Sequence, residues 1–145
     1  MATIQSFESL EVWKKARELS QAIFDITLVE DFSKDFALRN QINRASGSIM
    51  DNIAEGFERG GRKEFIQFLS YAKGSAGEVK SQLCRAADRD YISKQEFEKF
   101  EKEILEISKM IGGLINYLKK TSIEGVKYLK EPEELYQPYN FDLED

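Results

Sequence analysis

The side chains that most often carry catalysis or bind metals are scarce in this sequence. It contains no histidine and a single cysteine, Cys84. The lack of histidine removes the commonest general base and the usual partner of a nucleophile. Cys84 follows Leu83 in an apolar seam, so we expect a buried, unreactive thiol there. A single cysteine also excludes an internal disulfide and is typical of a reducing compartment, so we expect a cytoplasmic protein.

Carboxylates on predicted helices are the remaining candidates for a metal site: Glu55, Glu78, Glu103 and Glu106. Metal ligands in a helix bundle must point into its interior. Glu55 and Glu78 fall instead on the outward faces of their helices. We therefore predict no metal, no cofactor and no catalytic residue, and we expect that the protein is not an enzyme.

Two polar stripes are more informative than any catalytic motif. One consists of Arg44, Ser48, Asn52, Glu55 and Arg59, and the other of Gln67, Ser70, Gly74, Glu78 and Ser81. Steps of three and four residues place each stripe on one face of a helix, opposite an apolar seam. Such outward faces normally carry many lysines and glutamates. Here small and amide residues dominate: Ser46, Gly47, Ser48, Asn52, Ser70, Gly74, Ser75, Gly77 and Ser81.

The glycines of these stripes need an explanation, because a glycine inside a helix costs about 1 kcal/mol relative to alanine. Close approach of a helix from another subunit would provide one. We therefore predict an oligomer interface or polar network, in which the arginines and glutamates of the stripes form charge-assisted pairs. Its six residues are Arg44, Ser48, Asn52, Glu55, Gly74 and Glu78. The alternative is a polar, solvent-exposed face that tolerates glycine.

A basic cluster lies at the turn between the two central helices: Arg59, Arg62 and Lys63. Repeated around a symmetric oligomer, it would form a ring able to contact the phosphates of a nucleic acid. However, no aromatic residues interleave with it as stacking platforms, and neighbouring glutamates dilute its charge. Residues 1–120 hold 19 acidic and 19 basic side chains, so the net charge of −5 lies in residues 121–145. A neutral body with an acidic tail favours a protein partner, and an ordinary solvated turn is the simpler interpretation of the cluster.

Four helices are predicted from apolar periodicity: residues 10–29, 34–57, 63–87 and 94–120. Each has an apolar seam, and the seams are Leu10, Trp13, Ala16, Leu19, Ile23 and Ile26; Leu38, Ile42, Ala45, Ile49, Ile53 and Phe57; Phe65, Leu69, Ala72, Ala76, Val79 and Leu83; and Phe97, Ile104, Ile107, Ile111, Leu114 and Leu118. Four such helices joined by short turns predict an all-α protein, an antiparallel up-and-down four-helix bundle over residues 1–120. Residues 121–145 would form an acidic C-terminal tail, either extended or draped over the body.

Local signals predict where the helices begin and end. Ser6 or Ser9 would cap the first helix and Ser33 the second, after a short connection at residues 31–33. Gly60-Gly61 would close the second helix, and Ser93 with Glu96 reads as a capping box. No apolar run approaches membrane-spanning length, so we expect no contact with a membrane.

Three segments of the sequence resemble the 23S rRNA intervening-sequence protein family. They are LEVWKKA at residues 10–16, QINRASGSIMDNIAEG at residues 41–56 and KEFIQFLSYAKGSAGE at residues 63–78. The resemblance covers roughly residues 7–118. It implies a bacterial antiparallel four-helix bundle that assembles as a ring-like homo-pentamer, with a function that is unsettled within the family. The signature positions are Trp13, Arg44, Asn52, Glu55, Gly56, Arg59, Phe65, Gly74, Ser75 and Glu78.

A related group assists the reverse transcriptase of diversity-generating retroelements, and its basic pentameric barrel implies binding to nucleic acid. The present chain departs from these patterns. It has Asp31-Phe32-Ser33 where a proline is frequent, Gly60-Gly61 where a polar residue is frequent, and a neutral body with an acidic tail. We therefore expect a homo-oligomeric interaction protein with a protein partner. The alternative is an RNA-binding accessory factor that uses a ring of Arg59, Arg62 and Lys63.

Overall fold

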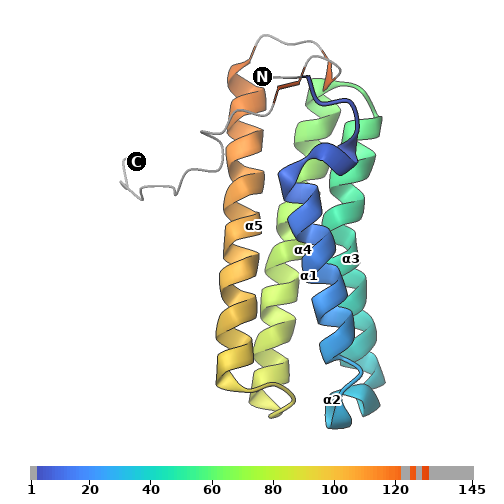
Figure 1. Ribbon diagram of the computed structural model, residues 1–145, viewed down its shortest axis with the longest axis vertical. Helices are drawn as coiled ribbons and strands as arrows, with labels where there is room; N and C mark the ends of the chain where they lie inside the picture. Colours follow the sequence, from blue (N-terminus) through green and yellow to red (C-terminus); the bar gives the residue numbers. More distant parts are fainter. Residues whose placement is uncertain (1–2, 122–124, 127–128, 131–145) are drawn as a thin grey trace, which may run out of the picture.

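The protein is all-α in the computed structural model, which describes residues 3–121, 125–126 and 129–130. A 3-10 turn, η1, precedes five α-helices, and no strand occurs among these residues. The elements are η1 (Phe7–Ser9), α1 (Glu11–Ile26), α2 (Glu30–Lys34), α3 (Phe36–Glu58), α4 (Arg62–Asp88) and α5 (Lys94–Lys120). Figure 1 shows the four long helices α1, α3, α4 and α5 lying side by side, with short turns between successive helices. We call these four helices the helical body.

The predicted apolar seams form the core of the helical body. All six seam residues of α3 and all six of α4 are buried, as are most of those of α1 and α5. Ile26 and Phe97 are only partly buried and pack against the edge of the core. The seams were predictable because side chains at three- and four-residue steps share one helix face, and burying that face is the main source of stability.

The connection between the first two long helices was predicted wrongly. Residues 30–34 form the short helix α2, whose Phe32 is fully buried and stacks on Tyr91 with ring centroids 5.2 Å apart. Because α2 occupies Ser33, the N-cap of α3 moves to Asp35, whose carboxylate accepts a hydrogen bond from the backbone N–H of Leu38 at 3.2 Å. The predicted cap at Ser33 is therefore wrong.

The other predicted helix ends have mixed outcomes. Neither Ser6 nor Ser9 caps α1, because residues 7–9 form η1 and the N-cap position falls to the buried Leu10. Gly60 has a φ of +84° just after α3, as predicted for a helix-ending glycine. The capping box is confirmed: the Glu96 N–H donates to Ser93 Oγ at 3.1 Å, and the Ser93 N–H donates to Glu96 Oε1 at 2.9 Å.

Segments from both ends of the chain cover one end of the helical body, at the α3–α4 turn. The Ile4 N–H donates to the Leu129 carbonyl at 2.8 Å, and the Val126 N–H donates to the Gly60 carbonyl at 2.9 Å. Val126 and Leu129 are buried in the core, so it extends beyond Lys120. We call this the closed end, at the top of Figure 1. Residues 131–145 of the predicted acidic tail lie outside the described residues.

Residues 24–36 form the opposite end, which we call the open end, at the bottom of Figure 1. Here Asp35 accepts hydrogen bonds from Arg89 at 2.7 Å and from the Tyr91 hydroxyl at 2.9 Å, joining the start of α3 to the α4–α5 turn. The backbone hydrogen bond from Leu38, then the one from Tyr91, holds the pKa of Asp35 below its ordinary value. The bond to Asp35 raises the pKa of Tyr91 above its ordinary value.

Two further expectations were tested by the fold. Cys84 is exposed and not buried, because Leu83 takes the core position and the next residue lies 100° further around α4. The prediction of a buried Cys84 is therefore wrong, because a residue next to a seam residue in the sequence does not share its helix face. Among the described helices, none is long and apolar enough to span a membrane.

Candidate interaction face

The two predicted polar stripes come together on neighbouring helices, α3 and α4. These helices approach closely at Gly56, where a Cβ atom would lie only 2.6 Å from Phe68 Cβ. The side chains of Ser48 and Ser75 share a hydrogen bond of 2.9 Å across the helix pair. Arg44, Ser48 and Glu78 therefore lie on one surface, which we call the α3–α4 face. Ser70 and Gly74, from the second stripe, lie at its edge, where they line a separate groove with residues of α5.

A hydrogen-bond network occupies the middle of the α3–α4 face. Asn52 Nδ2 donates to the Ser48 carbonyl at 2.8 Å and to Ser48 Oγ at 2.9 Å, and Ser48 in turn bonds Ser75. Ser75 is buried, as is Ser46, whose hydroxyl donates to the Asn43 carbonyl at 3.2 Å. The prediction that Ser46 and Ser75 lie on the outward faces is therefore wrong. Both serines are buried beside neighbouring helices, where the hydroxyl of Ser75 bonds that of Ser48 and the hydroxyl of Ser46 bonds the backbone of its own helix.

An open polar groove with a volume of about 550 Å³ runs along this face below the network. Its lining residues are Asn40, Gln41, Arg44, Ala45, Ser48, Ser75, Glu78, Gln82 and Arg85. Arg44 and Glu78 carry opposite charges on opposite walls, yet no ion pair or hydrogen bond joins either of them to the residues that the structure describes. Arg85 instead donates to Gln41 Oε1 at 2.7 Å. The groove thus presents two available charges and several small side chains to a partner.

Gln82 contributes an unsatisfied polar group at the wall of the groove. Its side chain is only 8% exposed, and its amide oxygen Oε1 has no hydrogen-bond partner within the described part of the chain. Leaving a buried acceptor unpaired costs about 1–3 kcal/mol. A sequence that sacrifices stability at one face generally does so for function.

The three glycines singled out in the sequence lie at positions where nothing in the chain packs against them. A Cβ atom at Gly47, Gly74 or Gly77 would meet nothing within 4 Å. Close packing inside one chain therefore does not account for these glycines. Gly56, which was noted as a signature position alone, is by contrast required by an internal helix contact.

The three residues of the basic cluster at the α3–α4 turn have different surroundings in the structure. Arg59 pairs with Glu55 at 2.9 Å on the same helix. Arg62 is partly buried, and its guanidinium donates to the carbonyls of Leu118 and Thr121, both at 3.1 Å. Lys63 is exposed. Arg62 therefore caps the C-terminal end of α5, where a cation is favoured by the orphan carbonyls.

Sequence reasoning missed two aromatic side chains beside this cluster. Arg59 lies over the ring of Phe68 at 5.3 Å from its centroid, and Phe68 contacts Tyr71 edge to face at 5.7 Å. Tyr71 is half exposed and accepts a hydrogen bond from Gln67. The sequence interpretation found no aromatic stacking platform interleaved with the basic cluster, and it did not anticipate that Phe68 would lie against Arg59. The spacing of the aromatic residues was the available signal. Phe65, Phe68 and Tyr71 follow one another at three-residue steps, which places Phe68 and Tyr71 beside the apolar seam of α4.

No group of three or more carboxylate or cysteine side chains converges in the described regions of the chain in a way that could hold a metal ion. Glu55 and Glu78 are exposed, as predicted, while Glu103 and Glu106 line a groove between α1 and α5. Glu106 forms an ion pair with Lys15 there at 3.1 Å. The candidate site that the structure supports best is the α3–α4 face with its open groove.

These features define an all-α protein whose distinguishing site is a polar, partly unpaired helix face. The chain belongs to the 23S rRNA-intervening sequence protein family, whose model matches residues 8–113. It is similar to the crystal structure of a protein with unknown function from the S23 ribosomal protein family of Bacteroides thetaiotaomicron, with 27% identity and a TM-score of 0.66. That match covers 72% of this chain and 95% of the other. A search of curated proteins finds no match.

Proposed function

We propose that this protein is a non-enzymatic, homo-oligomeric interaction protein that associates through its α3–α4 face. In this proposal each chain is an antiparallel up-and-down four-helix bundle, and the assembly is the pentamer that the family resemblance implies. The exposed single cysteine fits a reducing compartment, which supports a cytoplasmic role. The proposal assigns no catalytic residue and no cofactor.

The observation that carries this proposal is the unpaired state of the α3–α4 face. Arg44 and Glu78 face a common groove without partners in the described residues, and Gln82 Oε1 is buried without a donor. A second copy of the chain would supply an oppositely charged partner to Arg44 and to Glu78. It would also bury the small residues around Gly74. Tyr71 and Arg59 at the upper part of the face belong to the residue types that dominate binding energy at protein interfaces.

Substitution of Gly74 tests the proposal. Gly74→Leu adds a large side chain to open space on α4, so the isolated chain should stay helical and gain about 0.7–1 kcal/mol of helix propensity. At an interface the same side chain would block close approach, and the assembly mass in sedimentation velocity should fall. Lys99→Leu, at an exposed position of α5, is the matched control and should leave the mass unchanged. An unaltered mass for Gly74→Leu would exclude an interface that includes the surface of α4 at Gly74.

A double-mutant cycle tests the charges. We expect that Arg44→Ala and Glu78→Ala each weaken assembly by about 1 kcal/mol or more, because each would leave its partner's charge unpaired at an interface. If the two residues pair between subunits, the double variant should lose less than the sum of the single losses. Strict additivity would show that they do not interact.

A second candidate function is RNA binding, favoured by the contact of Arg59 with Phe68, which in turn contacts Tyr71, near the exposed Lys63. Aromatic faces stack on unpaired bases, and the cations would contact phosphates. Anisotropy with a labelled structured RNA at low and physiological salt tests it. Micromolar binding with a steep salt dependence, weakened by Lys63→Ala and Tyr71→Ala, would support it. No binding at low salt would exclude it for that RNA.

A further inference from the structure

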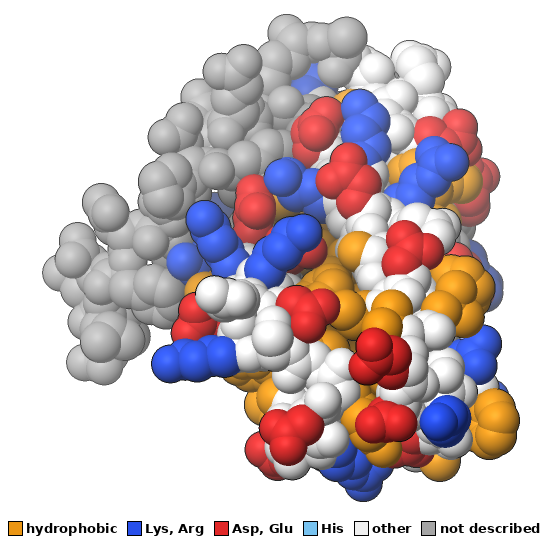
Figure 2. All heavy atoms as spheres, turned by 60° about the horizontal axis from the view of Figure 1, so that its bottom comes forward, with side chains coloured by type: hydrophobic (Ala, Val, Ile, Leu, Met, Phe, Trp, Pro, Cys, Tyr) orange, Lys and Arg blue, Asp and Glu red, His pale blue; other side chains and the backbone are white. Residues whose placement is uncertain are grey.

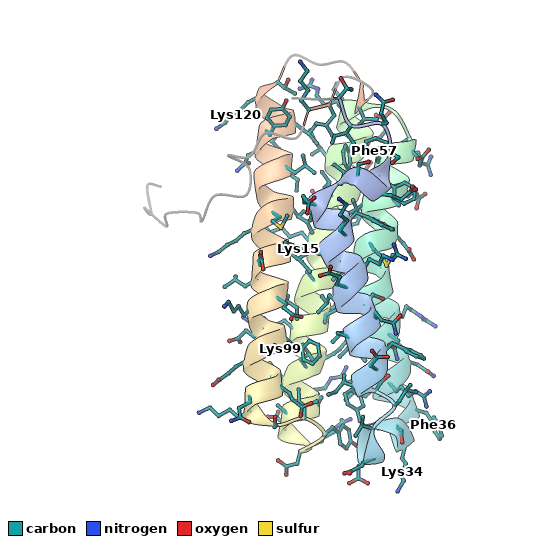
Figure 3. All side chains as sticks on the ribbon, in the orientation of Figure 1. Lys15, Lys34, Phe36, Phe57, Lys99 and Lys120 are labelled. Carbon is teal, nitrogen blue, oxygen red and sulfur yellow. The ribbon has the colours of Figure 1, made fainter. Side chains whose placement is uncertain are left out.

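The open end exposes large apolar side chains that the helical body leaves outside its core. Six large hydrophobic side chains are exposed among the described residues, and four of them come from residues 24–36: Phe24, Leu28, Val29 and Phe36, at 45%, 47%, 52% and 68%. Figure 3 shows Phe36 and Lys34 projecting from this end of the molecule. Concentrated exposure of this kind marks an interaction surface, whereas a single exposed leucine does not.

The local chain path explains why these side chains are outside. α1 ends at Ile26, and the chain must reverse direction to begin α3 at Phe36. Within this turn, Phe32 occupies the core position, and Leu28 and Val29 are left on the surface.

Glu30, next to the exposed pair, has a φ of +39°, a left-handed conformation that is unfavourable for a glutamate. Strain and apolar exposure in the same turn both cost stability. Backbone strain combined with an exposed apolar patch points to a binding role for the turn.

The charge of the open end indicates which partner it would bind. Residues 24–36 contain four acidic side chains and one basic side chain. The single base, Lys34, lies near Asp31 at 3.9 Å, and Asp35 is bonded to Arg89, which leaves Asp25 and Glu30 uncompensated by any ion pair in the described structure. Asp88 and Asp90 add negative charge from the adjacent α4–α5 turn. Figure 2, in which this end comes forward, shows acidic side chains spaced between apolar ones over the lower half of the view, with Lys and Arg side chains toward its edges.

We propose that the open end docks a basic amphipathic helix of another protein. The apolar side chains Leu28, Val29 and Phe36 would contact the apolar face of that helix, and Asp25 and Glu30 would attract lysines or arginines along its edges. A second copy docked end to end would bring the same acidic residues together, so like-charge repulsion disfavours that occupant. This surface adjoins the α3–α4 face, because Phe36 lies one turn before Asn40 and two turns before Arg44 on the same side of α3.

Synthetic peptides of defined charge test this proposal on the full-length protein. The first probe is a fluorescein-labelled helical peptide of lysine and leucine, with leucines on one face and lysines on the other. The second probe has glutamate in place of every lysine. We expect the lysine peptide to bind with micromolar affinity at low salt, to weaken as salt is added, and to bind at least tenfold more tightly than the glutamate peptide.

Variants of the protein localise the binding. Phe36→Ser should weaken binding of the lysine peptide about tenfold, and Glu30→Gln about twofold to threefold. Leu105→Ser is the matched control, because Leu105 is 49% exposed but lies on α5 away from the open end. That variant should bind like the wild type. Circular dichroism should be unchanged for all three variants, since each replaces an exposed side chain.

Three results would overturn the proposal. The first is equal binding of the lysine and glutamate peptides. The second is a Phe36→Ser variant that binds the lysine peptide as tightly as the wild type. The third is a fall in assembly mass for Phe36→Ser in sedimentation velocity, which would show that a second copy covers the open end. The first two results concern peptide binding and leave the Gly74→Leu measurement of assembly mass untouched, so a failure of the docking proposal and a failure of the oligomer proposal can be told apart.

Discussion

The two ends of the helical body solve the problem of terminating long helices in different ways. At the closed end, chain segments from outside the helices supply apolar cover through Val126 and Leu129, and Arg62 bonds the last carbonyls of α5. At the open end, Asp35 makes the polar connections to Arg89 and Tyr91, while Phe36 and its apolar neighbours stay outside. The closed end shows that this fold can cover the end of its helices. The exposed apolar side chains of the open end therefore call for an explanation of their own, such as a binding role.

The largest expected effect is loss of the apolar cover at the closed end. Leu129 is fully buried, so Leu129→Ala should reduce the free energy of unfolding by about 3 kcal/mol. Phe36→Ala at the open end should change it by less than about 0.5 kcal/mol, since Phe36 is largely exposed. Urea denaturation measures both. Equal losses for the two variants would remove the contrast between the ends.

Arg62 provides the polar half of the closed end. Arg62→Met should reduce the free energy of unfolding by about 2 kcal/mol, because it leaves the carbonyls of Leu118 and Thr121 without a charged donor. Lys63→Met is the control at the neighbouring exposed position and should have almost no effect. If Arg62→Met also proved neutral, the C-terminal end of α5 would be stable without this contact.

The open end should respond to pH through Asp35. Its pKa is lowered in the folded protein, so its contribution to stability is present above its ordinary pKa of 3.8 and is lost as the pH falls through the folded-state value. Asp35→Asn should lower the melting temperature by about 4 °C at pH 7, and the difference from the wild type should shrink below pH 4. Thermal melts followed by circular dichroism would measure this. A difference that stays constant down to pH 2 would contradict the role of the carboxylate.

The hydrogen bond between Tyr91 and Asp35 also makes the stability of the open end depend on pH in the alkaline range. Because the bond to Asp35 raises the pKa of Tyr91, the contribution of the neutral phenol is present below pH 10.0 and is lost as the pH rises through the raised value. Tyr91→Phe should therefore abolish this alkaline component and leave the acidic one reduced but present.

The smallest expected effect concerns the α3–α4 face between the two ends. Gln82→Met replaces a buried amide whose oxygen is unpaired in the described chain, and should raise the free energy of unfolding of the isolated chain by about 1 kcal/mol. Chemical denaturation at concentrations below assembly would show the gain. A loss of stability would mean that Gln82 is better accommodated than its contacts indicate.

The sequence predicted the features of this protein that depend on local periodicity. The seams of α3 and α4 and the capping box at Ser93 follow from side chains within one helix, so they needed no knowledge of the tertiary structure. The short helix α2 was missed because only tertiary burial of Phe32 stabilises five helical residues.

Features that depend on distant residues could not be predicted. Arg62 was read as a free cation because its partners at Leu118 and Thr121 lie more than fifty positions away. Val126 and Leu129 lie three residues apart, a spacing that allows a short helical turn but does not indicate which part of the helical body the two side chains cover. The α3–α4 face was predicted as two stripes, but their meeting through Ser48 and Ser75 required the structure.

The mass of the wild-type protein in solution tests the proposal of self-association most directly. Native mass spectrometry or sedimentation velocity over a range of micromolar concentrations would measure it. If the chain self-associates as proposed, we expect an assembly of five chains, each of 16.7 kDa. A mass of one chain at every concentration would contradict the proposal and leave the unpaired charges of the α3–α4 face to a different partner.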